Sequence, residues 1–333
     1  MPGHGRTAPP ATTRPAIARH EGPSEPGGPF SVAAPGSGWG ALVLGVAFAA
    51  MWSSAFTSAR IIVADAPPIL SLALRFALSG AIGVVLALAT GGTLRLSRGQ
   101  WHAVILFGLC QNALYLGLNF AAMQTIEAGL AAIIASTMPL LVAVVAWAAF
   151  GERTRPLGVA GLIAGAVGAA LILGTRLDGG ADPWGILLCG VGVVALTVAT
   201  LSVRGASAGG NVIAIVGLQM WVGAAALLPF GLLWETWDVI WTPRLTAAFA
   251  YTTLVPGLLA TWIWFVLVGR IGATPAAAFH FLNPFFGVVI AWALLGERLG
   301  PLDAVGVAVI AAGILAVQMS RIRTRRRPGA AEN

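Results

Sequence analysis

His280 is the side chain with the widest chemical range in an otherwise apolar part of this sequence. It lies in the stretch FHFLNP, three residues before Asn283 and four before Pro284. An imidazole exchanges a proton near neutral pH and also forms hydrogen bonds, so His280 is a candidate for proton coupling or for contact with a solute. A neutral histidine bonded to a neighbouring helix is the alternative. A kink at Pro284 would free a backbone carbonyl, so Asn283 is a further candidate.

A stripe of uncharged polar groups forms a second candidate site. Asn112, Tyr115 and Asn119 are spaced by three and then four residues, which places them on one face of a helix. Polar groups in an apolar helix avoid lipid, so we expect this face to line a cavity or to contact another helix.

Aromatic side chains supply the apolar wall of the expected site. The stretch WSSAF contains Trp52, Ser53 and Phe56, and Trp262 lies well inside a later apolar run. An aromatic cavity with a few amides and one histidine suits a zwitterionic or neutral amphipathic solute, such as an aromatic or branched amino acid. It does not suit a polyanion, because Arg75 is the only cation inside an apolar run.

The charged residues are expected to be structural. Arg75 is predicted to lie on the same side of the membrane as Glu127, so we expect an ion pair or another structural role for it. The triplet Gly-Glu-Arg occurs twice, and we interpret its charged residues as clamps or hinge contacts at helix ends. We expect hinges at two prolines that precede these triplets. The residues concerned are Glu152, Arg153, Glu297, Arg298, Pro139 and Pro284.

The elements that position these residues must be membrane helices. Of the 333 residues, 58% are hydrophobic and 9% are charged, against about 25% charged in soluble domains. Ten apolar segments have about 20 residues each, the length that a helix needs to cross a bilayer. They span residues 39–60, 68–89, 101–121, 128–149, 156–174, 184–203, 211–233, 246–268, 274–295 and 301–320. The fold class is therefore an all-α integral membrane protein with ten transmembrane helices.

The sequence contains an internal repeat. Residues 139–168 align with residues 284–313 without a gap, and thirteen of the 30 positions are identical. Trp39 and Trp184 keep the same offset of 145 residues and begin the first and sixth apolar segments. Each repeat thus holds five helices, residues 39–174 and 184–320. An odd number places the second repeat in the opposite orientation, an inverted-topology repeat that is typical of secondary transporters.

The arginine distribution predicts the orientation. With the N-terminus in the cytoplasm, fourteen arginines lie inside and four outside, so both termini are expected to be cytoplasmic. Residues 1–38 read as a disordered leader and residues 321–333 as a basic tail. We interpret the net charge of +7 as a topology signal beside lipid, and expect no nucleic-acid partner.

The repeated motifs resemble those of the drug/metabolite transporter superfamily, in particular its EamA-type members. The resemblance covers residues 39–320 and rests on Ala131-Ala132 before the first of the two prolines, Ala276-Ala277 before the second, and the two Gly-Glu-Arg triplets. It implies ten helices in two repeats, with the path lined by helices 1, 8 and 9. The substrate classes of the family include amino acids, nucleosides, sugars and dyes, and one branch handles aromatic amino acids.

These observations predict an inner-membrane secondary transporter that exports amino acids, aromatic or otherwise hydrophobic, or related small metabolites and drugs. A translocator of lipids or lipid-linked substrates is one alternative, and a membrane-embedded enzyme is another. The sequence contains neither G-x-x-x-x-G-K-[ST] nor H-E-x-x-H, so we expect no ATP site, no metal, no cofactor and no catalytic residue. Because the two repeats make one complete unit, we expect a functional monomer.

Overall fold

A computed structural model describes residues 38–150, 156–202, 212–271, 276–298 and 300–325. These residues form helices joined by short loops, and the described part contains no strand. The first repeat comprises α1 (Gly38–Asp65), α2 (Pro68–Ala89), α3 (Arg98–Phe107), η1 (Gly108–Leu116), α4 (Gly117–Ala122), α5 (Ala128–Ala135), α6 (Met138–Phe150) and α7 (Pro156–Asp178). The second comprises α8 (Pro183–Ser202), α9 (Val212–Trp234), α10 (Pro243–Thr252), η2 (Thr253–Leu259), α11 (Ala260–Ile271), η3 (Ala278–Leu282), α13 (Asn283–Leu295) and α14 (Pro301–Arg325).

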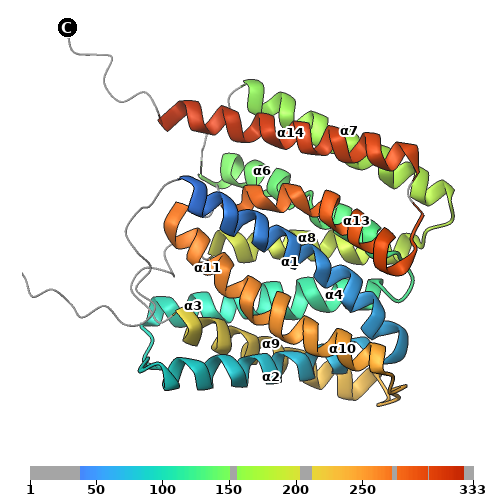
Figure 1. Ribbon diagram of the computed structural model, residues 1–333. Helices are drawn as coiled ribbons and strands as arrows, with labels where there is room; N and C mark the ends of the chain where they lie inside the picture. The colour runs from blue at the N-terminus through green and yellow to red at the C-terminus, as the bar shows by residue number, and fades with distance from the viewer. Residues whose placement is uncertain (1–37, 151–155, 203–211, 272–275, 299, 326–333) are drawn as a thin grey trace, which may run out of the picture. The chain divides into compact units, whose positions relative to one another are not determined.

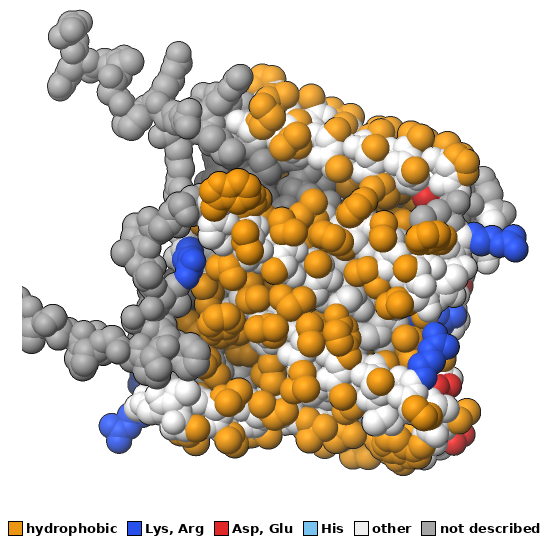
Figure 2. Space-filling model, viewed as in Figure 1, with side chains coloured by type: hydrophobic (Ala, Val, Ile, Leu, Met, Phe, Trp, Pro, Cys, Tyr) orange, Lys and Arg blue, Asp and Glu red, His pale blue; other side chains and the backbone are white. Residues whose placement is uncertain are grey.

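The helices have the length and composition of membrane spans. Within the described residues, seven are long and apolar enough to cross a bilayer, and three shorter apolar helices lie at 156–172, 283–295 and 301–313. These three occupy the positions of the fifth, ninth and tenth predicted spans, so the count of ten stays a prediction. Hydrophobic side chains cover the middle of the face shown in Figure 2, while arginine side chains lie at its left and right ends and acidic side chains at its right end. A large exposed apolar surface of this kind marks contact with a membrane or with another protein.

Two pairs of adjacent helices each consist of corresponding helices from the two repeats. Figure 1 shows α2 beside α9 and α7 beside α14, and the members of each pair are offset by about 145 residues. Both pairs are antiparallel. Along α7 and α14, a Cβ on Gly313 would lie 2.5 Å from the carbonyl oxygen of Gly161, and one on Gly168 would lie 2.9 Å from that of Gly306. The two contacts are equivalent under the repeat, because Gly161 corresponds to Gly306 and Gly168 corresponds to Gly313 at the 145-residue offset.

The same antiparallel order holds for α2 and α9. Leu70 lies against Gly231 and Val84 lies against Gly217, while the indole nitrogen of Trp221 donates to the carbonyl of Ala77 at 3.1 Å. The numbers therefore rise along α2 as they fall along α9. Small residues allow this close approach, which is how helices associate where lipid supplies no hydrophobic drive.

The irregular turns of the backbone are repeated as well. The π-helical segments η1 and η2 begin at Gly108 and Thr253, 145 residues apart. The helices α6 and α13 begin at Met138 and Asn283, again 145 residues apart. π-Helical turns are rare and are frequently found at functional sites. The duplication thus extends from the sequence to the places where the helices depart from regular geometry, and these places surround the candidate site.

Some boundaries differ from those predicted. The helix α1 continues to Asp65, beyond the predicted end at 60, and α14 continues to Arg325, into the predicted basic tail. The predicted fourth span is interrupted between Ala135 and Met138. Helix ends of this kind depend on capping and tertiary contacts, which hydrophobic length alone does not encode.

Candidate functional site

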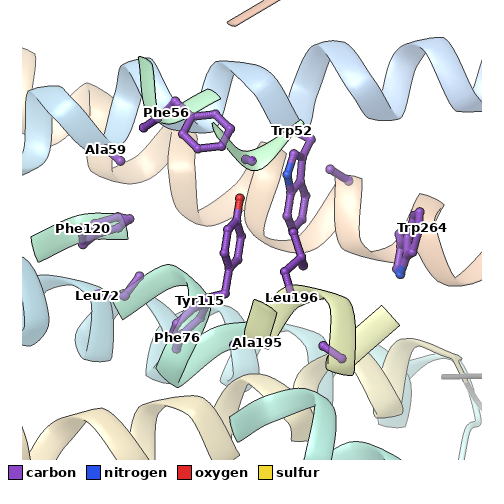
Figure 3. Packing of buried hydrophobic residues seen from close by; sticks show 14 of the residues in the cluster. Trp52, Phe56, Ala59, Leu72, Phe76, Tyr115, Phe120, Ala195, Leu196 and Trp264 are labelled. Atoms are coloured by element: carbon purple, nitrogen blue, oxygen red, sulfur yellow. The ribbon is translucent and has the colours of Figure 1, made fainter. Parts of the chain in front are cut away.

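The centre of the described structure is a cluster of aromatic rings from both repeats. Trp52 of α1 stacks on Tyr115 of η1, with parallel ring planes and centroids 6.4 Å apart. Figure 3 shows these two rings side by side, with Phe56 and Trp264 to either side. All four side chains are buried. The helix α1 supplies rings here because it contacts α10, α11, α13 and α5, and so lies at the centre of the packing.

His280 lies beside Trp264, at one end of this aromatic cluster. Its ring meets those of Phe48, Trp52 and Trp264 in edge-on contacts, with centroids 5.1, 5.6 and 5.2 Å away. Edge-to-face contacts of this kind are favourable for aromatic pairs. The 3₁₀ segment η3 places His280 here, and the neighbouring helix α13 begins with Asn283.

A chain of hydrogen bonds links the two repeats at this point. The hydroxyl of Ser53 donates to Oδ1 of Asn283 at 3.1 Å, and Nδ2 of Asn283 lies 2.9 Å from Nδ1 of His280. With the amide in this orientation, Nδ2 is the donor and Nδ1 the acceptor, so a neutral imidazole carries its proton on Nε2. The candidates Ser53, His280 and Asn283 are therefore in contact with one another.

A small cavity adjoins Trp52 and Tyr115. Its free volume is about 20 Å³, and it is lined by Trp52, Ala55, Phe56, Ala59, Arg75, Tyr115, Leu116, Asn119, Phe120, Met123 and Pro256. This volume accommodates about one water molecule, whereas sites for small molecules have volumes of about 300–1,000 Å³. The cavity is therefore too small for such a molecule, which could enter only if the surrounding helices separated.

The polar stripe of the third predicted span is divided between two surroundings. Asn112 donates to the backbone and side-chain oxygens of Gln219 in α9 and thus contacts a helix rather than the cavity. Asn119 lines the cavity, donates to the carbonyl of Tyr115 at 2.8 Å, and accepts from the thiol of Cys189 in α8. The hydroxyl of Tyr115 is buried beside the indole N–H of Trp52, and its O–H has no acceptor among the described residues.

Arg75 does not form the expected ion pair with Glu127. Its Nε donates to the carbonyl of Thr252 at 3.2 Å, its guanidinium lies over the ring of Phe76, and the side chain lines the cavity. The carbonyl of Thr252 is available because Pro256, four residues later, has no N–H to donate to it. Sequence reasoning missed Pro256, although a proline inside an apolar run is a visible signal of a freed carbonyl.

Trp262 lies at the margin of the cluster, partly buried. The central tryptophan of this segment is Trp264, which stacks on Phe48 with centroids 5.1 Å apart. Residues two positions apart on a helix point in nearly opposite directions. Trp264 is therefore a site residue that sequence reasoning missed, and no signal in the sequence alone favours it over Trp262.

Acidic side chains cap helix N-termini. The carboxylate of Glu297 accepts from the backbone nitrogens of Ala128 and Gly129 at 2.8 and 2.9 Å, at the start of α5. Glu235, which sequence reasoning missed, does the same for Ile69 and Leu70 in α2. Carboxylates at these positions satisfy free N–H groups and interact favourably with the helix dipole.

Asp182 is a third cap, outside the membrane spans. Its carboxylate accepts from the backbone nitrogens of Trp184 and Gly185, each at 3.1 Å, and from the hydroxyl of Thr125 at 2.7 Å. The hydrogen bond from Thr125 is the main cause that holds the pKa of Asp182 below its ordinary value. This bond also joins the loop after α4 to the loop before α8.

The remaining predicted structural residues lie at helix breaks and ends. Pro139 is the second residue of α6 and Pro284 the second of α13, each just after an interruption of the helix. Arg298 lines a larger open pocket of about 460 Å³ with Glu127 and Asp303. Glu152 and Arg153 lie outside the described residues.

Comparisons with known proteins agree with this architecture. The chain matches the EamA-like transporter family twice, over residues 39–174 and 183–319. It is 28% identical over 250 residues to the uncharacterized transporter YvbV of Bacillus subtilis, covering 75% of this chain and 82% of that one. It is 26% identical over 281 residues to the uncharacterized inner membrane transporter YedA of Escherichia coli, covering 81% and 88%. A solved crystal structure with 22% identity superposes with a TM-score of 0.65 over 85% of this chain and 99% of the other, which shows a shared fold.

Proposed function

Because this chain belongs to the EamA-like transporter family, within the drug/metabolite transporter superfamily, we propose that it exports aromatic or other hydrophobic amino acids, or related small metabolites and drugs. Membership of this family makes it a multi-pass membrane transporter rather than an enzyme. The substrate class and the direction are our proposal, as are the bacterial inner membrane as its location, cytoplasmic termini and function as a monomer.

The observation that carries the substrate proposal is the composition of the site. Trp52 stacks on Tyr115, and both Trp52 and Trp264 contact the ring of His280, which is hydrogen-bonded to Asn283. Aromatic faces bind apolar rings and alkyl chains, while a few well-placed polar groups orient the ligand. A small solute with one apolar and one polar end fits such a surface better than a sugar, which requires many hydrogen bonds.

Alternating access is the proposed mechanism, and the helix pairs support it. Inverted repeats are related by a twofold axis in the membrane plane, which places two corresponding helices antiparallel where they meet. The antiparallel contacts of α7 with α14 and of α2 with α9 have this geometry. In an inverted repeat, the first half can adopt the conformation of the second and the second that of the first, which converts an inward-open site into an outward-open one. The closed cavity corresponds to an intermediate between these states.

The test is counterflow in proteoliposomes that contain the purified full chain. Vesicles loaded with unlabelled L-phenylalanine should accumulate labelled L-phenylalanine from outside, and loading with L-tryptophan or L-leucine should also drive uptake. Vesicles loaded with glucose or uridine, and vesicles without protein, are the controls. Absence of amino-acid exchange would contradict the substrate proposal. Movement of labelled phospholipid between leaflets without amino-acid exchange would instead assign a lipid translocator.

A further inference from the structure

The guanidinium of Arg75 is buried beside the cavity without an acidic partner. The side chain is 4% exposed, and its Nε donates to one neutral carbonyl. Its terminal nitrogens donate no hydrogen bond within the described part of the chain, and no carboxylate there lies within salt-bridge distance of them. A charge inside a membrane span is costly unless it is paired. An uncompensated guanidinium that lines a cavity therefore marks a place for an anionic group.

The hydroxyl of Tyr115 is a second unsatisfied group at the same cavity. The side chain is fully buried; the indole N–H of Trp52 is directed at its oxygen as a donor, and its own O–H has no acceptor among the described residues. Figure 3 shows this hydroxyl directed towards Phe56 and Trp52, which also line the cavity. Leaving a buried hydroxyl without an acceptor is unfavourable. Its position is explained if a ligand supplies the acceptor.

The rest of the lining defines which ligand fits. The lining contains one cationic side chain, no Asp and no Glu, so it offers an ammonium group no anionic partner. Trp52 and Phe56 form an apolar wall beside the polar end. The site thus offers one positive charge and one hydroxyl donor next to two aromatic rings. This combination favours a single carboxylate attached to an apolar group.

We propose that Arg75 and Tyr115 bind the carboxylate of the transported solute, while Trp52 and Phe56 contact its apolar part. This inference rests on the proposed function and narrows it to monocarboxylates. The carboxylate accepts hydrogen bonds from the guanidinium and from the phenol, and it neutralises the buried charge. Such charge-assisted bonds are stronger than neutral ones. Loading of the site therefore replaces an unpaired cation by an ion pair.

Three probes that share a phenyl ring test the proposal. L-Phenylalanine carries an ammonium and a carboxylate, 3-phenylpropanoate carries only the carboxylate, and 2-phenylethylamine carries only the ammonium. Binding is measured as the ligand concentration that gives half of the maximal rise in melting temperature of the purified full chain. We expect both carboxylates to stabilise the protein and the amine to have no effect.

The variants Arg75→Gln and Tyr115→Phe identify the groups responsible. Loss of a hydrogen bond to a charged group weakens binding by about tenfold to a hundredfold, so Arg75→Gln should weaken binding of 3-phenylpropanoate by that factor. Tyr115→Phe should weaken it less, with little change in the melting temperature of the free protein, because the hydroxyl donates to no acceptor among the described residues. The exposed Arg95→Gln is the matched control and should bind as the wild type does. If Arg75→Gln does not fold, Tyr115→Phe still provides the test.

The outcomes separate this inference from the proposed function. Equal stabilisation by the amine and the carboxylates, or unchanged binding in both variants, would overturn the carboxylate site even if amino acids are exchanged. Binding of 3-phenylpropanoate through Arg75 without exchange of L-phenylalanine would support the carboxylate site and overturn the amino-acid proposal. Binding of none of the three probes would overturn both.

Discussion

At the scale of single residues, the two tryptophans predicted to bind substrate lie in different surroundings. Trp52 is buried between Tyr115 and His280, whereas Trp262 is partly buried at the margin of the core. The conservative change Trp52→Phe should keep the protein folded but remove contact area from the site. We expect it to reduce the thermal shift caused by L-phenylalanine, while the matched change Trp262→Phe leaves that shift at the wild-type value. Equal shifts in both variants would remove Trp52 from the site.

His280 has the surroundings of a neutral, packed imidazole. Three rings surround it, and its Nδ1 is occupied by the amide of Asn283. We therefore expect an imposed proton gradient to leave the rate of phenylalanine exchange unchanged in the wild type. His280→Gln should weaken exchange through lost packing, without changing its response to pH. A gradient-driven flux that His280→Gln abolishes would instead make His280 the coupling residue.

The element scale shows which parts of the site the sequence could predict. The contact of Ser53 with Asn283 involves two predicted residues, because polar groups inside apolar spans seek one another. The partner of Asn112 could not be predicted, since Gln219 is close only because α9 packs on η1. The choice between Trp262 and Trp264 depends on η2, which precedes them. A π-helical turn contains an extra residue and shifts the face of every later side chain, so a count in steps of 3.6 residues fails.

The cap formed by Glu297 gives a testable prediction for the repeated Gly-Glu-Arg triplet. The carboxylate accepts from two backbone nitrogens at the start of α5. Glu297→Ala leaves both N–H groups without this acceptor and should lower the stability by about 1–2 kcal/mol. Glu297→Gln keeps one acceptor oxygen and should lower the stability by less than Glu297→Ala does. The measurement is unfolding of both variants in detergent, and an unchanged stability of Glu297→Ala would show that the cap is dispensable.

At the scale of the whole molecule, the antiparallel pairing of corresponding helices is the central feature. The 145-residue offset made the repeat predictable from the sequence. The positions of the helices were predictable because the thickness of the bilayer sets the length of each apolar segment. The contacts between the repeats were not predictable from one sequence. In a membrane helix, the side that faces lipid and the side that faces another helix are both apolar, so hydrophobicity does not distinguish them. The structure supplies them through α7 with α14 and through α2 with α9.

Gly313 tests the closeness of this pairing. A Cβ there would lie 2.5 Å from the carbonyl oxygen of Gly161 and 2.7 Å from the nitrogen of Gly165, and backbone atoms cannot move aside as a flexible side chain does. Gly313→Ala should therefore destabilise the protein by about 1–3 kcal/mol. Gly174→Ala in the same pair of helices meets nothing within 4 Å and is the matched control. It should be neutral or stabilising, because alanine favours helix. Equal stability of both variants would contradict the packing of α7 on α14.

The central claim, that one site between inverted repeats opens to each side in turn, is tested most directly by labelling a cysteine in the cavity. Ala59→Cys is placed in a chain whose two native cysteines, Cys110 and Cys189, are replaced. Ala87→Cys, equally buried but away from the cavity, is the control. A thiol reagent that does not cross membranes is added to right-side-out and to inverted vesicles. We predict labelling of Ala59→Cys from both sides, slowed by L-phenylalanine, and no labelling of Ala87→Cys. Labelling of Ala59→Cys from one side only would contradict the account.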